Sequence, residues 1–466
     1  MDSRQSSVTT QIEKYKQNLI NGNYAISLTE ILQHDSCQRI LSECREFRDR
    51  IYTPIKTIFT FIRQVLNADK SCKNVVATLA AEELKESKKK ISENTGPYCK
   101  ARQRIPEKTV EELVKVTGQI AATKSLSGWK PYGRNLIVFD GSTAKMQDTV
   151  ANQQVFPQSR SQKAGIGFPI TRFVVILSLT IGTVLNYAIG AYSGKGTGES
   201  SLLRSIFCSV KSGDIALGDR YFPSFFLICD LKAVGADGIF RGQAQRHYDF
   251  RTGVSLGKND HVATWEKPQK PEWMTDEEYA AYPSQMQVRE FKINGNVYVT
   301  TFLNSKKYHK QELSKIYERR WEVEISLKNI KNTMNMDFLS CKRPDMVKKE
   351  IGIHFLAYNF IRIMMAEACA KHQAFPNKIS FKGSVQLIRA FMPHFISSSE
   401  EKNKMMYDHL LKLIVKNKIG NRPGRMEPRA IKRRPKAFPL LKKSRDVEKH
   451  KLMRKAKKIK LEDVMS

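Results

Sequence analysis

Four polar side chains in the stretch YERRWEVEISLKNIK, residues 317–331, are spaced so that they could share one face of a helix. The stretch contains no Gly or Pro, and its apolar residues recur at helical intervals. At about 100° per residue, one stripe roughly 60° wide holds all four: Tyr317, Arg320, Glu324 and Lys331. Taken alone, this stripe is more simply explained as a salt-bridged helix edge, where each pair contributes only about 0.2–0.5 kcal/mol.

The same angular positions separate the two glutamates of the stretch. Glu324 borders the apolar stripe that would pack on a core, which consists of Ile316, Val323, Leu327, Ile330 and Met334. Glu322 lies about 160° around the helix axis from Glu324 and is expected to point to solvent. If one of the two carboxylates does chemistry, we therefore expect it to be Glu324.

Two aspartates elsewhere in the chain each close a short apolar run that is typical of a strand. Asp140 ends the run NLIVFD and Asp219 ends the run DIALGD. If these strands are parallel neighbours, both carboxylates leave the same edge of one sheet, where α/β proteins bind ligands. Together with Glu324 they could hold two Mg²⁺ ions, which prefer carboxylate, water and phosphate oxygens. Two such ions can activate an attacking hydroxyl and stabilise the leaving oxygen of a phosphodiester. Each Asp alone is at least as well explained as the cap of a turn or helix.

The sequence between the two aspartates predicts the elements that must position them. Strand-like and helix-like runs follow one another in the order β-β-β-α-β-α-β from residue 135 to residue 242. This order predicts an α/β fold with a mixed sheet flanked by helices. A polar stretch follows and ends in alternating runs around Asn294 and Gly295, a strong hairpin signal.

These features divide the chain into five expected parts. They are a helical N-terminal domain (1–125), a first part of the core (126–243), a β-rich insertion (244–305), a second part of the core with the Glu-bearing helix (306–400) and a basic C-terminal region (401–466).

The charge balance points to a polyanionic partner. The chain of 466 residues holds 79 Lys and Arg against 46 Asp and Glu, a formal net charge of +33. Dense positive charge favours nucleic acid, because neutralised phosphates release counterions.

Neither the cysteines nor the apolar segments indicate an extracellular or membrane protein. The eight cysteines are scattered without C-x2-C pairs, so we expect no zinc ribbon and reduced thiols, as in a cytoplasm. Residues 173–192 are long enough to span a membrane but are rich in β-branched residues, which favours two strands joined near Gly182. The N-terminus lacks the apolar core of a signal peptide.

The stripe residues fit the spacing Y-x2-R-x3-E-x6-K, which resembles the YREK signature of a large group of bacterial insertion-sequence transposases, the "IS four" group of DDE enzymes. The resemblance covers most of the chain. Six further segments are similar to this group, in order: NTGPYCKARQRIP, FDGSTAKMQDTVANQQVFPQ, GIGFPITRFVVILSLTIG, GKGTGESSLLRSI, GDIALGDRYF and NRPGRMEPRAIKRRPKAFPLL.

The resemblance implies an RNase H-like core interrupted by a β insertion before the Glu-bearing helix. It implies that Asp140, Asp219 and Glu324 form the DDE triad and bind two Mg²⁺ ions, for which Mn²⁺ can substitute. It also implies that the Tyr, Arg and Lys of the stripe contact phosphates at the DNA ends. The expected activity is cleavage of the terminal inverted repeats and joining of the ends to target DNA.

Several further expectations accompany this interpretation. The N-terminal domain would recognise the DNA end, although it shows no clear helix-turn-helix signature, and pairing of two ends would need a homodimer in the nucleoid of a bacterial cytoplasm. Arg241 is a weaker candidate for DNA binding. Trp265, with Trp273 as second choice, is a candidate for stacking on a flipped base, and packing in the insertion explains Trp265 equally well. Two alternatives remain: a metal-dependent nuclease without strand transfer, and a non-catalytic or domesticated DNA-binding protein.

Overall fold

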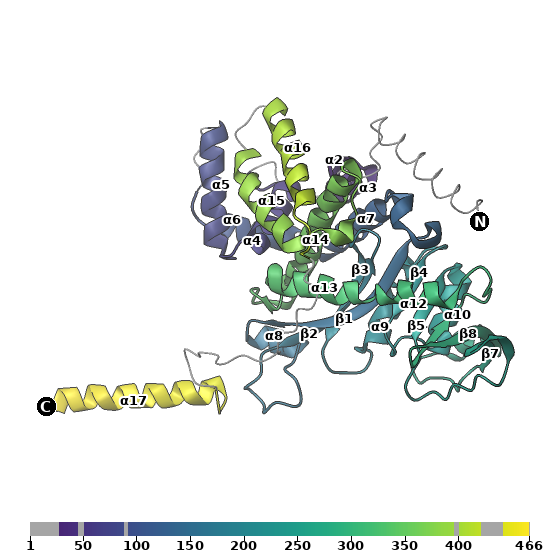
Figure 1. Ribbon diagram of the computed structural model, residues 1–466. Helices are drawn as coiled ribbons and strands as arrows, with labels where there is room; N and C mark the ends of the chain where they lie inside the picture. The colour runs from purple at the N-terminus through teal and green to yellow at the C-terminus, as the bar shows by residue number, and fades with distance from the viewer. Residues whose placement is uncertain (1–27, 45–50, 88–91, 396–399, 421–440, 466) are drawn as a thin grey trace.

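A ten-stranded mixed sheet forms the centre of the protein, as seen in a computed structural model that describes residues 28–44, 51–87, 92–395, 400–420 and 441–465 (Figure 1). The strands follow the order β3-β2-β1-β4-β5-β9-β8-β7-β6, and the short β10 pairs with β1. Their bounds are β1 (Leu136–Met146), β2 (Ile170–Ser178), β3 (Val184–Ala191), β4 (Ile215–Gly218), β5 (Asp237–Arg241), β6 (Val254–Gly257), β7 (Asp260–Glu266), β8 (Gln285–Ile293), β9 (Asn296–Thr300) and β10 (Phe338–Leu339).

The first five strands form the half of the sheet in which parallel and antiparallel neighbours are mixed. Strands β1, β4 and β5 are parallel neighbours, whereas β2 is antiparallel to both β1 and β3. The predicted order β-β-β-α-β-α-β is confirmed by β1, β2, β3, α9 (Glu199–Ile206), β4, α10 (Phe225–Val234) and β5. Sequence reasoning missed one short helix between β1 and β2, α8 (Val150–Val155).

The apolar run near Gly182 forms strands rather than a membrane helix. Strands β2 and β3 meet at Gly182, whose φ of +88° is a conformation that L side chains rarely adopt. No helix among the described residues is long and apolar enough to cross a membrane.

The two faces of the sheet pack against two separate cores. Alternate side chains of a strand point to opposite faces. Leu136 and Val138 of β1 therefore join one core, and Ile137 and Phe139 join the other. The first core includes much of α14 (Pro344–Lys371), and the second includes α9 and α10. Asp140 follows the alternation of Leu136 and Val138, so it lies on the α14 side of the sheet.

The insertion does not form a separate sheet. Its last strand, β9, pairs antiparallel with β5, and β8, β7 and β6 follow outward in turn. The predicted hairpin at Asn294 and Gly295 is confirmed, with positive φ at both residues. One short helix, α11 (Asp276–Ala280), interrupts these strands.

The stretch predicted as one continuous helix is broken into three pieces. They are α12 (Lys310–Glu318), α13 (Trp321–Lys328) and a π-helical turn, η4 (Asn329–Thr333). Arg319 and Arg320 join the first two pieces with helical backbone angles, so the direction of the chain is nearly kept. The π turn, however, shifts Lys331 from the position that a uniform 100° step predicts.

A block of helices covers one side of the sheet and surrounds α14, in which 24 of 28 residues are buried. Apolar residues all round α14 explain why it is central. The surrounding helices are α2 (Leu28–Gln33), α3 (Asp35–Ser42), α4 (Pro54–Leu66), α5 (Cys72–Ser87), α6 (Gly96–Arg104), α7 (Glu107–Thr123), α15 (Phe381–Phe395) and α16 (Glu400–Lys416).

Residues 94–106, which the turn-forming residues suggested to be a loop, contain α6 instead. Thr95 and a Pro in the first turn begin this helix. The segment 9–21, where the sequence also predicts a helix, lies outside the described residues with the rest of 1–27 and with 421–440. The last helix, α17 (Arg445–Met465), extends away from the rest of the molecule (Figure 1).

Candidate active site

The register of β1 and β4 places the two predicted aspartates opposite one another. The last parallel pair of these strands joins Val138 to Leu217. Asp140 lies two residues beyond Val138, and Asp219 lies two residues beyond Leu217. The expectation that the strands are parallel neighbours is therefore confirmed. Asp140 does not end its strand, however, because β1 continues to Met146 by pairing with β2 and β10.

Asp140 lies half-buried in a negatively charged environment. Its Oδ1 accepts a hydrogen bond of 2.9 Å from the N–H of Gly141. Burial raises the pKa of the Asp140 carboxyl to about 6, Arg320 lowers it, and the carboxylates of Asp219 and Glu199 raise it. Carboxylates that share a site repel one another, and a bound cation would relieve this repulsion.

Asp219 occupies the turn just after β4. Its Oδ1 accepts a hydrogen bond of 2.8 Å from the N–H of Tyr221, so the cap explanation also holds for this residue. The carboxylate is close enough to influence Asp140, Glu199 and Tyr317 electrostatically. A cap at the turn and a ligand at the sheet edge are compatible, because a carboxylate has further lone pairs to offer.

Glu324 approaches this edge from α13, but Arg320 holds it. Arg320 Nη2 donates a hydrogen bond of 2.8 Å to Glu324 Oε1. Arg320 also acts electrostatically on Asp140, so its positive charge influences both carboxylates. Among the described residues, no three His, Cys, Asp or Glu side chains are placed to hold one metal ion. The carboxylate oxygens near this edge are donors of the kind that Mg²⁺ prefers.

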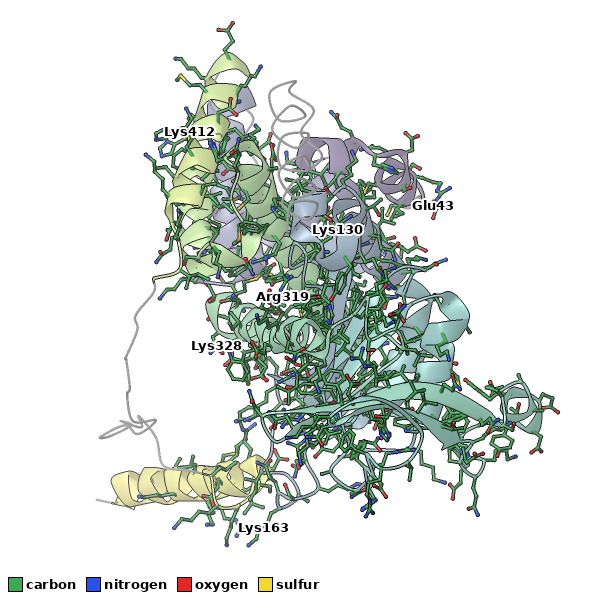
Figure 2. All side chains as sticks on the ribbon, turned by 45° about the vertical axis from the view of Figure 1, so that its right-hand side comes forward. Glu43, Lys130, Lys163, Arg319, Lys328 and Lys412 are labelled. Carbon is green, nitrogen blue, oxygen red and sulfur yellow. The ribbon has the colours of Figure 1, made fainter. Side chains whose placement is uncertain are left out.

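Glu322 has a different role and a different position from the one predicted. It is half-buried rather than solvent-facing, because Arg319 donates to it at 2.9 Å and Asn377 donates to it at 3.3 Å. Arg319 also donates to the carbonyl of Leu179, which ties α13 to the sheet. In Figure 2, Arg319 and Lys328 mark the helix that carries both glutamates. Glu322 is therefore part of a structural ion pair.

Tyr317 and Arg241 lie beside the aspartates. Tyr317 is buried and packs edge-on against Tyr298 at 5.3 Å, and the Arg241 guanidinium lies 5.7 Å from the same Tyr298 ring. Burial raises the pKa of Tyr317, Arg320 and Arg241 lower it, and Asp219 raises it. Arg241 also donates a hydrogen bond to Asn296. Tyr317 thus faces the charged groups of the site, and Arg241 already has one structural partner.

The π turn η4 places Lys331 beside β1, just beyond Asp140 along the strand. Lys331 Nζ lies 3.3 Å from Ser142 Oγ on β1, two residues after Asp140. Burial lowers the pKa of Lys331, Asp337 raises it and Lys145 lowers it. Of the four stripe residues, Tyr317 therefore contacts β9 and Lys331 contacts β1, while Arg320 and Glu324 pair with one another.

Sequence reasoning missed a fourth acid, Glu199, at the first position of α9. A Cβ added at Gly141 would lie only 2.5 Å from Glu199 Cδ, so the Glu199 side chain lies directly over the residue that follows Asp140. Burial raises the pKa of Glu199, Arg172 lowers it and Asp219 raises it. An acid in the first turn of a helix is common, so its type and position gave no signal.

Trp265 is placed in the core of the insertion, which favours the packing explanation over stacking on a base. Its ring is 2% exposed, its Nε1 donates to Glu290 Oε1 at 2.7 Å, and Arg246 covers one ring face at 3.7 Å. The second choice, Trp273, is 47% exposed, and its ring carries the guanidinium of Arg204 at 3.6 Å.

Comparisons with known proteins point to one family. Residues 131–360 match the family model described as "Transposase DDE domain". Over 357 residues the chain is 23% identical to "Transposase InsG for insertion sequence element IS4" of Escherichia coli K12, which covers 74% of this chain and 78% of that protein. A shorter match of 72 residues, 16% of this chain and 19% of the relative, is 28% identical to "Transposase for insertion sequence element IS421" of Escherichia coli.

Among solved structures, the piggyBac transposase synaptic complex with hairpin DNA matches with a TM-score of 0.41 and 9% identity, covering 85% of this chain and 84% of that one. The family model and the InsG match both span the edge of the sheet that carries the candidate site. Residues 131–360 of the chain are therefore similar to a transposase DDE domain, and most of the chain is distantly similar to InsG.

Proposed function

We propose that this chain cuts the ends of its insertion sequence and joins them to target DNA, with Asp140, Asp219 and Glu324 as catalytic residues. The single observation that carries the proposal is the register of β1 and β4, which brings Asp140 and Asp219 to matching positions at one sheet edge. The Glu-bearing helix crosses the same edge, since α13 packs against β1. Glu324 on α13 and the basic side chains beside it complete the proposed site.

Two Mg²⁺ ions, with Mn²⁺ as a substitute, are the proposed cofactors, and Asp140, Asp219 and Glu324 would hold them. When bound, such ions supply a nucleophilic hydroxyl and stabilise the leaving oxygen in hydrolysis and in transesterification by the freed 3′-OH. The chain's own contribution is to gather the two aspartates on neighbouring strands and to bring the glutamate toward them on α13.

Arg320 is proposed to exchange its partner, from Glu324 to a phosphate of the DNA. Its Nη2 donates a hydrogen bond of 2.8 Å to Glu324. A DNA phosphate is an equally good partner for a guanidinium, since both phosphate and carboxylate match its fork of donors. We infer that phosphate binding draws Arg320 away and leaves Glu324 free to face Asp140 and Asp219.

Tyr317, Lys331 and Arg241 are the proposed further contacts to the DNA end. Lys331 extends along β1 past Asp140, and Arg241 lies on the opposite side near Tyr317. The formal charge of +33 suits a chain that binds terminal inverted repeats and target DNA. Pairing two ends requires at least two active sites, so we propose a homodimer on DNA.

The test is cleavage of DNA that carries the ends of the chain's own insertion sequence, with Mg²⁺ present. Asp140→Asn should reduce cleavage by more than about a hundredfold, because even the outer partners of metal ligands are worth roughly 10–100-fold. End binding, measured by gel shift, should persist. Asp148→Asn, which changes a nearby acid outside the site, is the matched control and should cleave normally. Undiminished cleavage by Asp140→Asn would refute the assignment, and cleavage without joining would identify a nuclease.

A further inference from the structure

Two cysteines that are far apart in the sequence meet inside the helical block. Cys72 is the first residue of α5 and Cys99 lies in α6, and their Sγ atoms are 3.7 Å apart. Both side chains are partly exposed, so a small solute can reach them. A disulfide requires the sulfurs to approach to about 2.05 Å, a movement within the reach of side-chain rotation.

A buried arginine connects the two thiols. Arg102 Nη2 lies 3.1 Å from Cys72 Sγ and 3.7 Å from Cys99 Sγ. Its Nη1 donates to Gln64 Oε1 at 3.1 Å. A guanidinium beside a sulfur stabilises the thiolate, which is the reactive form. Burial acts in the opposite direction and raises the pKa of the Cys72 thiol, while Arg102 lowers it.

The guanidinium is fixed by aromatic neighbours, so it cannot easily follow the sulfurs. Arg102 lies 4.8 Å from the ring of Phe61 on α4 and 4.9 Å from the ring of Tyr98 on α6. The Tyr98 hydroxyl in turn donates to Gln64 at 2.8 Å. The two sulfurs are therefore held against a rigid cationic centre that joins α4 and α6.

We propose that Cys72 and Cys99 form a redox-active dithiol that a hydroperoxide converts into a disulfide between α5 and α6. One thiolate attacks the peroxide O–O bond and becomes a sulfenic acid, and hydrogen peroxide leaves one oxygen as water. The second sulfur then attacks the sulfenic sulfur, forms the S–S bond and releases a second water. Two thiols lose two electrons and two protons in total, and one peroxide is reduced to two waters.

Oxidation changes the contacts of the helical block as well as its covalent structure. A disulfide cannot ionise, so Arg102 could no longer be paired with a thiolate and would rely on Gln64 as its acceptor. A buried charge that loses partners is destabilising, which gives the pair a reason to rearrange. The new bond would also join α5 to α6, and both of these helices pack on α4, which packs on α14. This inference does not depend on the catalytic proposal.

The first test oxidises the reduced full-length chain with limiting hydrogen peroxide, blocks free thiols and maps peptides by mass spectrometry without reduction. We expect a peptide pair joined through Cys72 and Cys99, which dithiothreitol restores to free thiols. The pair should be lost in Cys72→Ser and in Cys99→Ser and retained in Cys208→Ser, which removes an exposed cysteine. Separate blocking of Cys72 and Cys99 after oxidation, or joining of either to another cysteine, would overturn the proposal.

A second test uses the unmodified chain and does not depend on the folding of a variant. Phenylarsine oxide bridges two adjacent thiols, so the reduced chain should bind it at Cys72 and Cys99, with both thiols protected from alkylation. Prior peroxide treatment should abolish binding of the arsenical, because the two sulfurs are then already joined to one another. Alkylation of both cysteines at the same rate with and without the arsenical would show that the sulfurs do not act as a pair.

Discussion

The aspartate half and the glutamate half of the candidate site are held in different ways. Asp140 and Asp219 sit on neighbouring parallel strands, whose hydrogen-bonded register fixes their relative position. Glu324 sits on α13, between two breaks in the helix, and is held by an ion pair with Arg320. A ladder of backbone hydrogen bonds cannot shift by less than a whole register, whereas a side-chain ion pair can exchange its partner. We therefore call Asp140 and Asp219 the fixed wall of the site, and Glu324 with Arg320 the adjustable wall.

Replacing the carboxylate of the adjustable wall should have the largest effect. Glu324→Gln keeps the size of the side chain but removes a negative charge, so we expect cleavage of end-bearing DNA to fall by more than about a hundredfold. Glu322→Gln on the same helix is the matched control. It weakens the ion pair with Arg319 but should keep cleavage within a few-fold of the parent chain. Loss of cleavage in Glu322→Gln alone would reverse the assignment of the two glutamates.

The strand that carries the fixed wall should contribute more to the stability of the protein than the helix that carries the adjustable wall. Leu217 is fully buried in β4, so Leu217→Ala should reduce the free energy of unfolding by about 2–5 kcal/mol. Ile325 on α13 is 44% exposed, and Ile325→Ala should cost about 0.5 kcal/mol or less. Urea denaturation followed by circular dichroism measures both. Equal losses in the two variants would mean that the helix is as firmly packed as the strand.

The fixed wall was the part that the sequence revealed. Asp140 and Asp219 each follow a run of apolar residues that is short enough to be a buried strand, and an acid after such a run is a simple local signal. The choice of Glu324 over Glu322 rests on helical spacing and stays a prediction. The outward direction predicted for Glu322 was wrong, because Asn377, distant in sequence, and Arg319 together hold that carboxylate.

Long-range contacts account for the features that the sequence did not reveal. The breaks around α13 carry no Gly or Pro, so local propensity gave no warning of them. Glu199 and the Cys72–Cys99 pair depend on how helices pack, and their spacing along the chain carries no signal. In α6 a local signal was present, since a Thr and a Pro often begin a helix, but the Asn before the Thr and the Gly between Thr and Pro favoured a loop.

Replacing Arg320 tests the proposal that this residue exchanges Glu324 for a DNA phosphate. Arg320→Gln removes one cation that we expect to bind phosphate. End binding should weaken by about 1.5–3 kcal/mol, the range for hydrogen bonds to charged groups. The slope of log affinity against log salt should fall in magnitude by about 1. Titration by fluorescence anisotropy at several salt concentrations measures both quantities. Unchanged binding would show that Arg320 serves only to hold Glu324.

Replacing Lys331 should have the smallest effect on DNA binding. Lys328, three residues earlier at the end of α13, is exposed and serves as the matched control. Lys331 Nζ reaches Ser142 on β1, beside Asp140, whereas the structure gives Lys328 no contact with the sheet edge. A lysine acts on phosphate as a point charge, so Lys331→Met should weaken end binding by about 1 kcal/mol and reduce the salt slope by about 1. Lys328→Met removes the same charge, so it should change binding less if position decides the effect. Equal losses would mean that the helix attracts DNA by its net charge alone, and the adjustable wall would then extend no further than Glu324 and Arg320.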